Sequence, residues 1–248
     1  MARMHTGLRL TAATGPLYVR VREGIVKRIA EGHWVAGHML PSEIRLGQEF
    51  GVSQGTVRKA LDELAAANIV VRRQGKGTFV ATHTHERALF HFFHLNRDDG
   101  TRELPESRVL SCRRRRASRL DAARLRLPAD ARVIVIERVR DLMAQPAIAE
   151  TVILPEARFP GLGKPHARDL PNTLYQLYQE RYGVTVARAV EHLRAVAADA
   201  ADSRALGVPV GTPLLEIERL ALTLDGAPVE LRLSRCDTAE HYYESVIE

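Results

Sequence analysis

The sequence predicts a two-domain α+β protein, in which a small domain of three helices and a β-hairpin precedes a larger domain built on an antiparallel sheet. Three observations support this. The 248 residues are enough for two domains, and 45% of them are hydrophobic while only 5% are aromatic, as in soluble globular proteins. The net charge of +6 lies entirely in residues 1–82. Helical periodicity dominates that part, whereas short paired strand runs dominate the remainder.

The first two helices are predicted from apolar spacing and from helix-end residues. Apolar residues recur every four positions at Leu17, Val21, Ile25 and Ile29. This pattern predicts a helix over residues 16–32, with a proline near its start. A short helix is expected to follow from Ser42 to Phe50, and Gly51 is expected to end it.

The third helix, residues 53–67, has an apolar stripe on one face and short polar or cationic side chains on the other. Ser53 can cap its first N–H groups. The stripe consists of Val57, Leu61 and Leu64, and the opposite face carries Gln54, Thr56, Arg58 and Lys59. Such a helix suits the DNA major groove, where base edges and phosphates would meet its first two turns. Taken alone, the pattern fits an ordinary amphipathic surface helix better.

Two short β-type runs, residues 69–71 and 78–80, enclose a basic loop that contains two glycines. A basic hairpin of this kind can lie along a phosphate backbone or enter the minor groove. Three helices followed by a basic hairpin constitute a winged helix-turn-helix. The candidate DNA contacts of the hairpin are Arg72, Arg73, Gln74, Gly75 and Lys76. The localised positive charge favours a polyanionic partner for this domain alone.

Residues 16–81 are similar to the DNA-binding domain of the GntR family of bacterial transcription regulators, above all in the motifs LPSE, TVRKAL and QGKGTFV. The resemblance implies DNA contacts from Ser42, Ser53, Thr56, Arg58, Gln74, Gly75 and Lys76. Two positions depart from the family pattern. Ile44, followed by Arg45, stands where arginine is frequent, and Gln54 stands where many members have arginine. Since glutamine pairs naturally with adenine and arginine with guanine, these departures bear on the operator sequence.

Beyond a polar linker at residues 83–89, strands and helices alternate over residues 90–248. Strands are expected from about 109 and over 133–143, 148–154, 185–196, 214–224 and 228–235, and helices over 118–127, 171–182 and 199–206. Neighbouring strands with short connections favour an antiparallel sheet with helices. The four consecutive arginines from Arg113 to Arg116 are interpreted as a solvated strand end, because this domain is otherwise neutral.

Charged residues interrupt two apolar strands of the larger domain. Arg138 and Arg140 are two positions apart, so both side chains project from one face, about 7 Å apart along the strand. Together they could grip one anionic group. Glu150 and Glu230 lie among apolar strand residues and must be paired or solvated. The sequence leaves two possibilities open, a ligand-binding face or an internal salt-bridge ladder on an open sheet face.

Residues 90–234 resemble the UTRA effector domain of HutC-type GntR regulators, for example in IERVRD, NTLYQLYQERYGV and DGAPVELRLS. The resemblance implies a chorismate-lyase-like fold and an effector pocket formed by Ser107, Arg108, Arg138, Arg140, Glu150, Thr173, Tyr175 and Glu230. Thr173 and Tyr175 lie at a predicted helix start, where free N–H groups favour an anion. The family pattern is lost after residue 234, which leaves the last pocket contact open between Cys236 and a tyrosine at 242 or 243.

Together these features predict a homodimeric DNA-binding transcription regulator, most simply a repressor released from a near-palindromic operator by a small anionic metabolite. No catalytic residue is assigned, because no nucleophile, base and orienting group stand at motif spacing. The alternatives are an enzyme with a chorismate-lyase-like domain and a constitutive DNA-binding dimer without an effector.

Neither a cofactor nor a metal is expected. No carboxylate or cysteine completes a ligand set with His83, His85, His91 and His94. The two cysteines, Cys112 and Cys236, have neither metal-ligand spacing nor a disulfide framework around them. With no membrane-spanning run and no signal-peptide pattern, a cytoplasmic location is expected.

Overall fold

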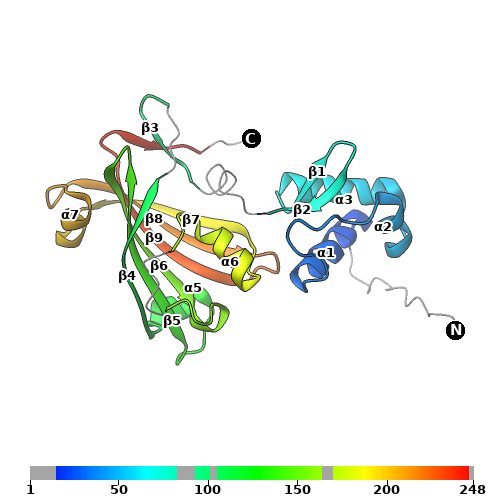
Figure 1. Cartoon of the computed structure of the whole chain (residues 1–248), viewed down its shortest axis with the longest axis horizontal. Coiled ribbons are helices and arrows are strands. Elements are labelled where there is room, and N and C mark those ends of the chain that lie inside the picture. Colours follow the sequence, from blue (N-terminus) through cyan, green and yellow to red (C-terminus); the bar gives the residue numbers. More distant parts are fainter. Residues whose placement is uncertain (1–14, 83–92, 101–104, 164–169, 246–248) are drawn as a thin grey trace. The chain divides into compact units, whose positions relative to one another are not determined.

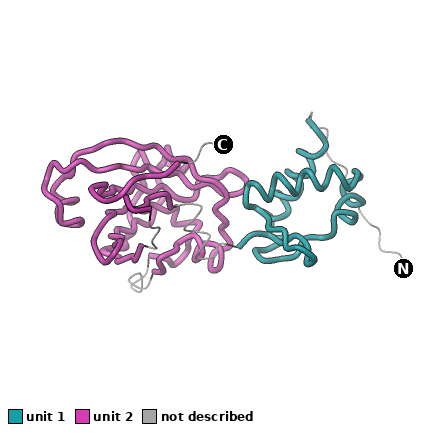
Figure 2. Tube along the Cα trace, turned by 90° about the horizontal axis from the view of Figure 1, so that it is seen from above, with its two compact units in different colours: residues 1–82 teal, residues 83–248 magenta. Residues whose placement is uncertain are grey.

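The computed structural model describes residues 15–82, 93–100, 105–163 and 170–245. The chain divides into two compact units, residues 1–82 (unit 1) and 83–248 (unit 2), shown in Figure 2. No helix in the described ranges is long and apolar enough to cross a bilayer.

Unit 1 is the predicted winged helix-turn-helix (Figure 1). Its elements are α1 (Leu17–Ala30), α2 (Glu43–Phe50), α3 (Gln54–Ala66), β1 (Val70–Arg73) and β2 (Gly77–Val80). The predicted apolar stripe of α3 is buried, and α3 contacts both α1 and α2. β1 and β2 pair antiparallel, with Arg73 opposite Gly77.

The ends of α2 and α3 are fixed by the residues that the sequence singled out. The Ser42 hydroxyl accepts a hydrogen bond from the Arg45 N–H at 3.3 Å, and the Ser53 hydroxyl accepts one from the Thr56 N–H at 3.2 Å. Gly51 ends α2 at a φ of 66°, in the left-handed region that glycine adopts without strain. The tight turn therefore follows from local chemistry.

Unit 2 is organised around one six-stranded antiparallel sheet in the order β4-β5-β6-β9-β8-β7. The strands are β4 (Glu106–Arg116), β5 (Arg132–Leu142), β6 (Gln145–Pro155), β7 (Val186–Ala197), β8 (Pro213–Thr223) and β9 (Pro228–Asp237). The helices in its described ranges are α5 (Arg119–Leu125), α6 (Leu174–Tyr182) and α7 (Ala200–Leu206), and a 3₁₀ turn, η1, covers Glu156–Arg158. The predicted α+β class with an antiparallel sheet is confirmed.

Alternation along the strands divides the core of unit 2 between the two faces of the sheet. Ile134 and Ile136 pack in the cluster that contains the α6 residue Tyr178. Val133 and Val135 pack in the cluster that contains Leu125 of α5. Because neighbouring strand residues point to opposite faces, one strand supplies both clusters. The face covered by α6 also carries the buried charges described below.

A second small sheet was not predicted. β3 (Leu95–Arg97) pairs antiparallel with β10 (His241–Tyr243), with Leu95 opposite Tyr243. The side chain of Leu95 packs with Ile148 and Cys236 of the large sheet. Each strand has only three residues, too few for a periodic signal, and neither forms a ladder without a partner distant in sequence.

At Gly47 in the helix-turn-helix there is no room for a methyl group. A Cβ at Gly47 would lie 2.9 Å from the Val52 carbonyl oxygen, whereas a Cβ at Gly55 would lie 3.9 Å from its nearest neighbour, the Ser53 hydroxyl. Gly47→Ala should lower the free energy of unfolding of unit 1 by about 1 to 3 kcal/mol. Urea unfolding followed by fluorescence of Trp34, the single tryptophan and a buried residue of unit 1, measures this change.

Gly55→Ala is the matched control, because it makes the same chemical change in a helix with open space around it. It should leave stability unchanged or raise it by about 0.5 to 1 kcal/mol, the usual preference for alanine over glycine in helices. Equal effects of the two substitutions would contradict the steric argument.

Candidate functional site

Unit 1 exposes the side chains that the sequence predicts to contact DNA. They come from the start of α2, the start of α3 and the hairpin. Ser42, Arg45, Ser53, Gln54, Arg58, Lys59, Arg72, Arg73, Gln74, Gly75 and Lys76 are exposed, and Thr56 is half-buried. Two of the cations also contact aromatic rings: the Lys59 ammonium lies 4.0 Å from the Tyr18 ring centroid, and the Arg73 guanidinium 4.7 Å from that of Phe79.

A carboxylate lies among these cations. Glu43, the first residue of α2, accepts hydrogen bonds from Gln54 Nε2 at 3.1 Å, from Arg58 Nη2 at 2.9 Å and from Arg72 Nη1 at 3.2 Å. The hydrogen bonds from Arg58 are the main reason why the pKa of Glu43 lies below its ordinary value, against a smaller opposing effect of burial. Glu43 is thus bonded to the reading helix and to the hairpin at once.

In unit 2, a row of charges crosses the sheet on the face that α6 covers. Glu150 of β6 lies opposite Arg138 of β5 on one side and opposite Ser234 of β9 on the other. The Glu150 carboxylate accepts hydrogen bonds from Arg138 Nε, from Arg232 Nη1 at 3.2 Å and from the Ser234 hydroxyl at 3.3 Å. Cross-strand neighbours of this kind interact directly.

The row continues through Glu230, which is fully buried. Its carboxylate accepts hydrogen bonds from Arg232 Nε at 2.9 Å and from the hydroxyls of Tyr175 at 2.9 Å and Tyr178 at 2.7 Å. Burial raises the pKa of Tyr175 to about 12, so its hydroxyl keeps the proton that it donates. The two tyrosines belong to α6, and Glu230 therefore links this helix to the sheet.

Burial alone would raise the pKa of Glu150, but the positive charges of Arg138, Arg232 and Arg140 hold it well below the ordinary value. A further arginine, Arg219 of β8, pairs with Glu191 of β7 at 2.5 Å. Each of these carboxylates is therefore an anion that compensates at least one buried guanidinium.

Arg140 differs from the other buried arginines. The residue is only 7% exposed, its Nε has no hydrogen-bond partner, and no carboxylate of the described residues lies within ion-pair distance. Its guanidinium carbon lies 5.1 Å from the centroid of the Phe93 ring. Burial, followed by the charges of nearby arginines, lowers the pKa of Arg140 to about 9, although Glu150 acts in the opposite direction.

A charge excess follows from these pairings. We call the set of Arg138, Arg140, Arg219, Arg232, Glu150, Glu191 and Glu230 the buried charge cluster. Four arginines face three carboxylates within it, so one positive charge is uncompensated by the described residues. Arg140 is the arginine without a carboxylate partner.

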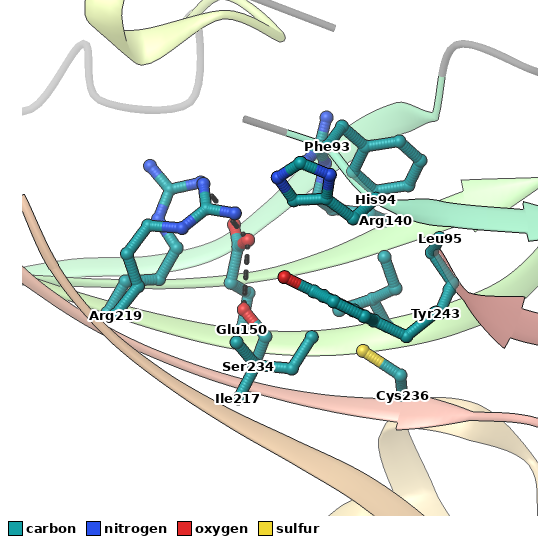
Figure 3. A pocket seen from close by; sticks show the side chains of 12 residues that line it. Phe93, His94, Leu95, Arg140, Glu150, Ile217, Arg219, Ser234, Cys236 and Tyr243 are labelled. Carbon is teal, nitrogen blue, oxygen red and sulfur yellow. Dashed lines mark hydrogen bonds and ion pairs between the residues drawn. The ribbon is translucent and has the colours of Figure 1, made fainter. Parts of the chain in front are cut away.

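Arg140 lines a small pocket beside β3 and β10 (Figure 3). The polar lining consists of His94, Arg140, Glu150, Arg219, Arg232, Ser234 and Tyr243, and the remaining lining of Phe93, Leu95, Ile148, Ile217 and Cys236. The Tyr243 hydroxyl donates a hydrogen bond to Glu191, and its ring lies 5.3 Å from that of His94. A cationic side and an apolar side suit a small anion with a partly apolar body.

The structure does not gather all eight predicted effector residues in this pocket. Arg140 and Glu150 line it, while Arg138, Tyr175 and Glu230 are engaged in the interior of the cluster. Ser107, Arg108 and Thr173 lie elsewhere: Ser107 lies opposite Arg140 on β4, Arg108 pairs with Asp141 at 3.6 Å, and Thr173 precedes α6. Both Cys236 and Tyr243, left open as the last pocket contact, line the pocket, whereas Tyr242 does not.

Comparison with known proteins settles the family. Residues 17–80 match the family model of bacterial regulatory proteins of the gntR family, and residues 101–242 match that of the UTRA domain. The chain is a GntR-family regulator with a UTRA domain. As in other such proteins, it is a DNA-binding transcription regulator with an effector domain.

Named relatives and a solved structure agree with this assignment. A probable fructoselysine utilization operon transcriptional repressor of Escherichia coli K12 is 30% identical over 87% of this chain and 88% of its own length. The histidine utilization repressor of Pseudomonas putida is 47% identical over 75 residues, 30% of each chain. The ligand-binding domain of a GntR-family regulator from Bordetella bronchiseptica has a TM-score of 0.57 and 34% identity, over 62% of this chain and 96% of its own.

Several site residues of this GntR regulator were missed by sequence reasoning. Arg219, like Arg138, follows a glutamate and precedes an apolar residue on a strand, and Arg232 lies between two leucines. The argument applied to Arg138 could therefore have found both. Glu43 belongs to the recognised LPSE motif, but an acid was not expected on a cationic surface. Arg138 and Arg140 are buried, so the open sheet face of the salt-bridge alternative is not what the structure shows.

The histidine group, at which the sequence predicts no metal site, lies only partly within the described residues. His83, His85 and His91 lie outside the described residues, and His94 lies beside Tyr243. Within the ranges that the structure describes, no group of three or more His, Cys, Asp or Glu is placed to hold a metal ion. The arginines from Arg113 to Arg116 form the end of β4. Arg113 and Arg114 pair with partly exposed carboxylates, and Arg115 pairs with the buried carboxylate of Asp121.

Glu150→Gln should lower the free energy of unfolding of unit 2 by about 3 to 5 kcal/mol, because buried arginines lose their anion. Since the pKa of Glu150 lies below its ordinary value of 4.5, this contribution is present above that pH and is lost as the pH falls through the folded-state pKa. Calorimetric melting at pH 7 and in acid measures both effects.

The matched control is Glu137→Gln, which removes a half-exposed carboxylate that pairs with Arg113 at 2.8 Å on the same sheet. Its cost should not exceed about 1 kcal/mol. A Glu150 variant that melts like the Glu137 variant would show that the buried charge cluster does not stabilise the unit.

Proposed function

We propose that this GntR regulator is a repressor whose operator binding is relieved by a small anionic metabolite bound beside Arg140. The observation that carries the proposal is the uncompensated guanidinium of Arg140 at the wall of this small pocket. A buried cation without an anion is unfavourable, so an anionic ligand gains binding energy by compensating it. The relatives named as repressors support the direction of control.

The DNA-binding surface in this proposal is the exposed side of α2, α3 and the hairpin of unit 1. The excess charge of +6 in residues 1–82 supports attraction to phosphates. Arg58, which lies opposite the buried stripe of α3, is the proposed base-reading or phosphate-binding residue at the centre of this surface. Its side chain is 58% exposed and therefore accessible to DNA.

The active species in this proposal is a homodimer formed through unit 2, and its operator is a near-palindrome with two half-sites. Unit 1 is small and strongly basic, so self-association through it is disfavoured. Effector binding favours a dimer geometry whose two units 1 no longer match the half-site spacing. The effector must then bind that geometry more tightly than the DNA-bound one.

Binding without chemistry is favoured at the pocket over an enzymatic reaction. The thiol of Cys236 is the strongest potential nucleophile in the lining, but burial raises its pKa to about 12. Because the thiolate rather than the thiol is nucleophilic, this side chain is inert near neutral pH. The pocket then returns its ligand unchanged, which product analysis by mass spectrometry can verify.

Operator binding can be tested by selecting duplexes from a random-sequence library with the full-length protein. The selected duplex should contain two inverted half-sites, and Arg58→Ala should weaken its binding by at least tenfold without changing Trp34 fluorescence melting. Fluorescence anisotropy measures affinity, and sedimentation in the presence of the duplex measures stoichiometry. A single asymmetric half-site, or wild-type affinity of the Arg58 variant, would contradict the proposed surface.

Arg140→Met should abolish the response to the effector but retain DNA binding and stability, because the lost cation has no carboxylate partner among the described residues. A thermal-shift screen of sugar phosphates and carboxylates identifies compounds that stabilise the wild type. Each hit is then tested for release of the selected duplex from both proteins. The variant should bind duplex normally and show no release.

Arg116→Met is the control for this experiment, since Arg116 is an exposed arginine at the end of β4. It should respond like the wild type. A normal response of the Arg140 variant to the hits would place the effector elsewhere.

A further inference from the structure

The carboxylate of Glu43 stands at the meeting point of three elements of unit 1. It begins α2, bonds Gln54 and Arg58 of α3, and bonds Arg72 of β1. Its side chain is only 16% exposed, while that of Arg58 is 58% exposed. Glu43 therefore lies behind the exposed guanidinium rather than in front of it.

The hydrogen bonds occupy one particular edge of the Arg58 guanidinium. Nε donates to Glu43 at 3.1 Å and Nη2 at 2.9 Å, so the Nε–Nη2 edge faces the carboxylate. Such a two-point contact fixes both the position and the plane of the group. The outer edge, formed by Nη1 and the second N–H of Nη2, remains available for a guanine or a phosphate.

Arg72 has a different geometry, although the sequence assigned it to the same class of DNA contacts. Its Nη1 bonds Glu43 at 3.2 Å, and its Nη2 bonds Asp62 at 2.8 Å and the Arg58 carbonyl oxygen at 3.3 Å. Both terminal nitrogens are thus directed at protein acceptors. Arg72 supports the carboxylate and the helix that hold Arg58.

Gln54 is oriented by the same carboxylate. Because a carboxylate only accepts hydrogen bonds, the amide nitrogen of Gln54 must be the atom that faces Glu43, at 3.1 Å. One N–H and the amide oxygen remain free, which is the pair that a glutamine uses to bind adenine. The carboxylate thereby selects one of the two amide orientations.

A carboxylate at this place opposes general DNA affinity, because it repels phosphates and neutralises cations that would attract them. The pKa of Glu43 is lowered, so it stays ionised at neutral pH. Its benefit must therefore lie in geometry, since fixed donors discriminate between bases whereas mobile cations bind any phosphate.

We propose that Glu43 is a positioning residue for sequence recognition: with Arg72 as support, it fixes Arg58 and Gln54 for base contact and suppresses non-specific DNA binding. This inference rests on the DNA-binding surface proposed above. It assigns a role in specificity to a residue that acts through Arg58 and Gln54, and a supporting role to Arg72.

Glu43→Asp is the decisive variant, because it keeps the charge but withdraws the carboxylate by one methylene group. Using the selected duplex and a random duplex of equal length, the operator-to-random affinity ratio should fall about tenfold. Glu43→Gln removes the charge as well. It should also lower the ratio, with random-duplex affinity equal to or above that of the wild type.

Glu63→Gln serves as the charge-matched control, since Glu63 of α3 pairs with Arg22 of α1 at 2.9 Å and bonds no proposed DNA contact. It should leave the ratio within twofold of the wild type. Melting followed by Trp34 fluorescence identifies any variant that loses the fold, and Glu43→Asp, which keeps an acid at the helix start, is expected to fold.

Arg58→Ala, measured in parallel, distinguishes a failure of the proposed DNA-binding surface from a failure of the positioning role of Glu43. If it weakens operator binding and both Glu43 variants keep the wild-type ratio, the surface is correct and the positioning proposal is wrong. If Glu43→Gln tightens operator and random binding equally, Glu43 acts only as a charge, which also overturns the proposal. If Arg58→Ala binds like the wild type, the proposed surface itself fails.

Discussion

The buried arginines in the middle of unit 2 depend on the carboxylate of Glu150. A guanidinium inside a protein is tolerated only when an anion and hydrogen bonds replace its water. Glu150 supplies both to Arg138 and Arg232, which lie on the strands to either side of β6. Through Arg232 the same row reaches Glu230 and hence the tyrosines of α6. The helix is thus held by specific polar bonds as well as by apolar packing, and among the described residues the end of the row at Arg140 has no counter-charge.

Most of the fold could be predicted because its signals are local. The caps at Ser42 and Ser53, the turn at Gly51 and the alternation along β5 each depend on residues close together in sequence. β3 and β10 could not be predicted in the same way. Three-residue strands have almost no intrinsic preference, and their ladder exists only because the large sheet brings two distant segments together.

For the buried charge cluster, several of the charged residues could be predicted from the sequence, but not which arginine pairs with which carboxylate. Strand alternation places Arg138, Arg140 and Glu150 on a common face, yet it does not say which arginine meets the carboxylate. Register decides this: Glu150 lies opposite Arg138, and Ile148 lies opposite Arg140. A shift of two residues would preserve every side-chain direction and reverse the roles of the two arginines. The role of Glu43 likewise depends on the approach of α2, α3 and β1, which no local pattern contains.

The pairing of β3 with β10 determines when the pocket of unit 2 can be completed during synthesis, relative to the DNA-binding unit. Domains generally form as units while the chain is made from its N-terminus. All elements of unit 1 are present once residue 80 has been made, whereas the wall of the pocket that contains Tyr243 must wait for β10. A nascent chain can therefore possess the DNA-binding fold while the proposed effector pocket is still incomplete. The structure needed for the proposed response to an effector is therefore completed well after the structure needed to bind DNA.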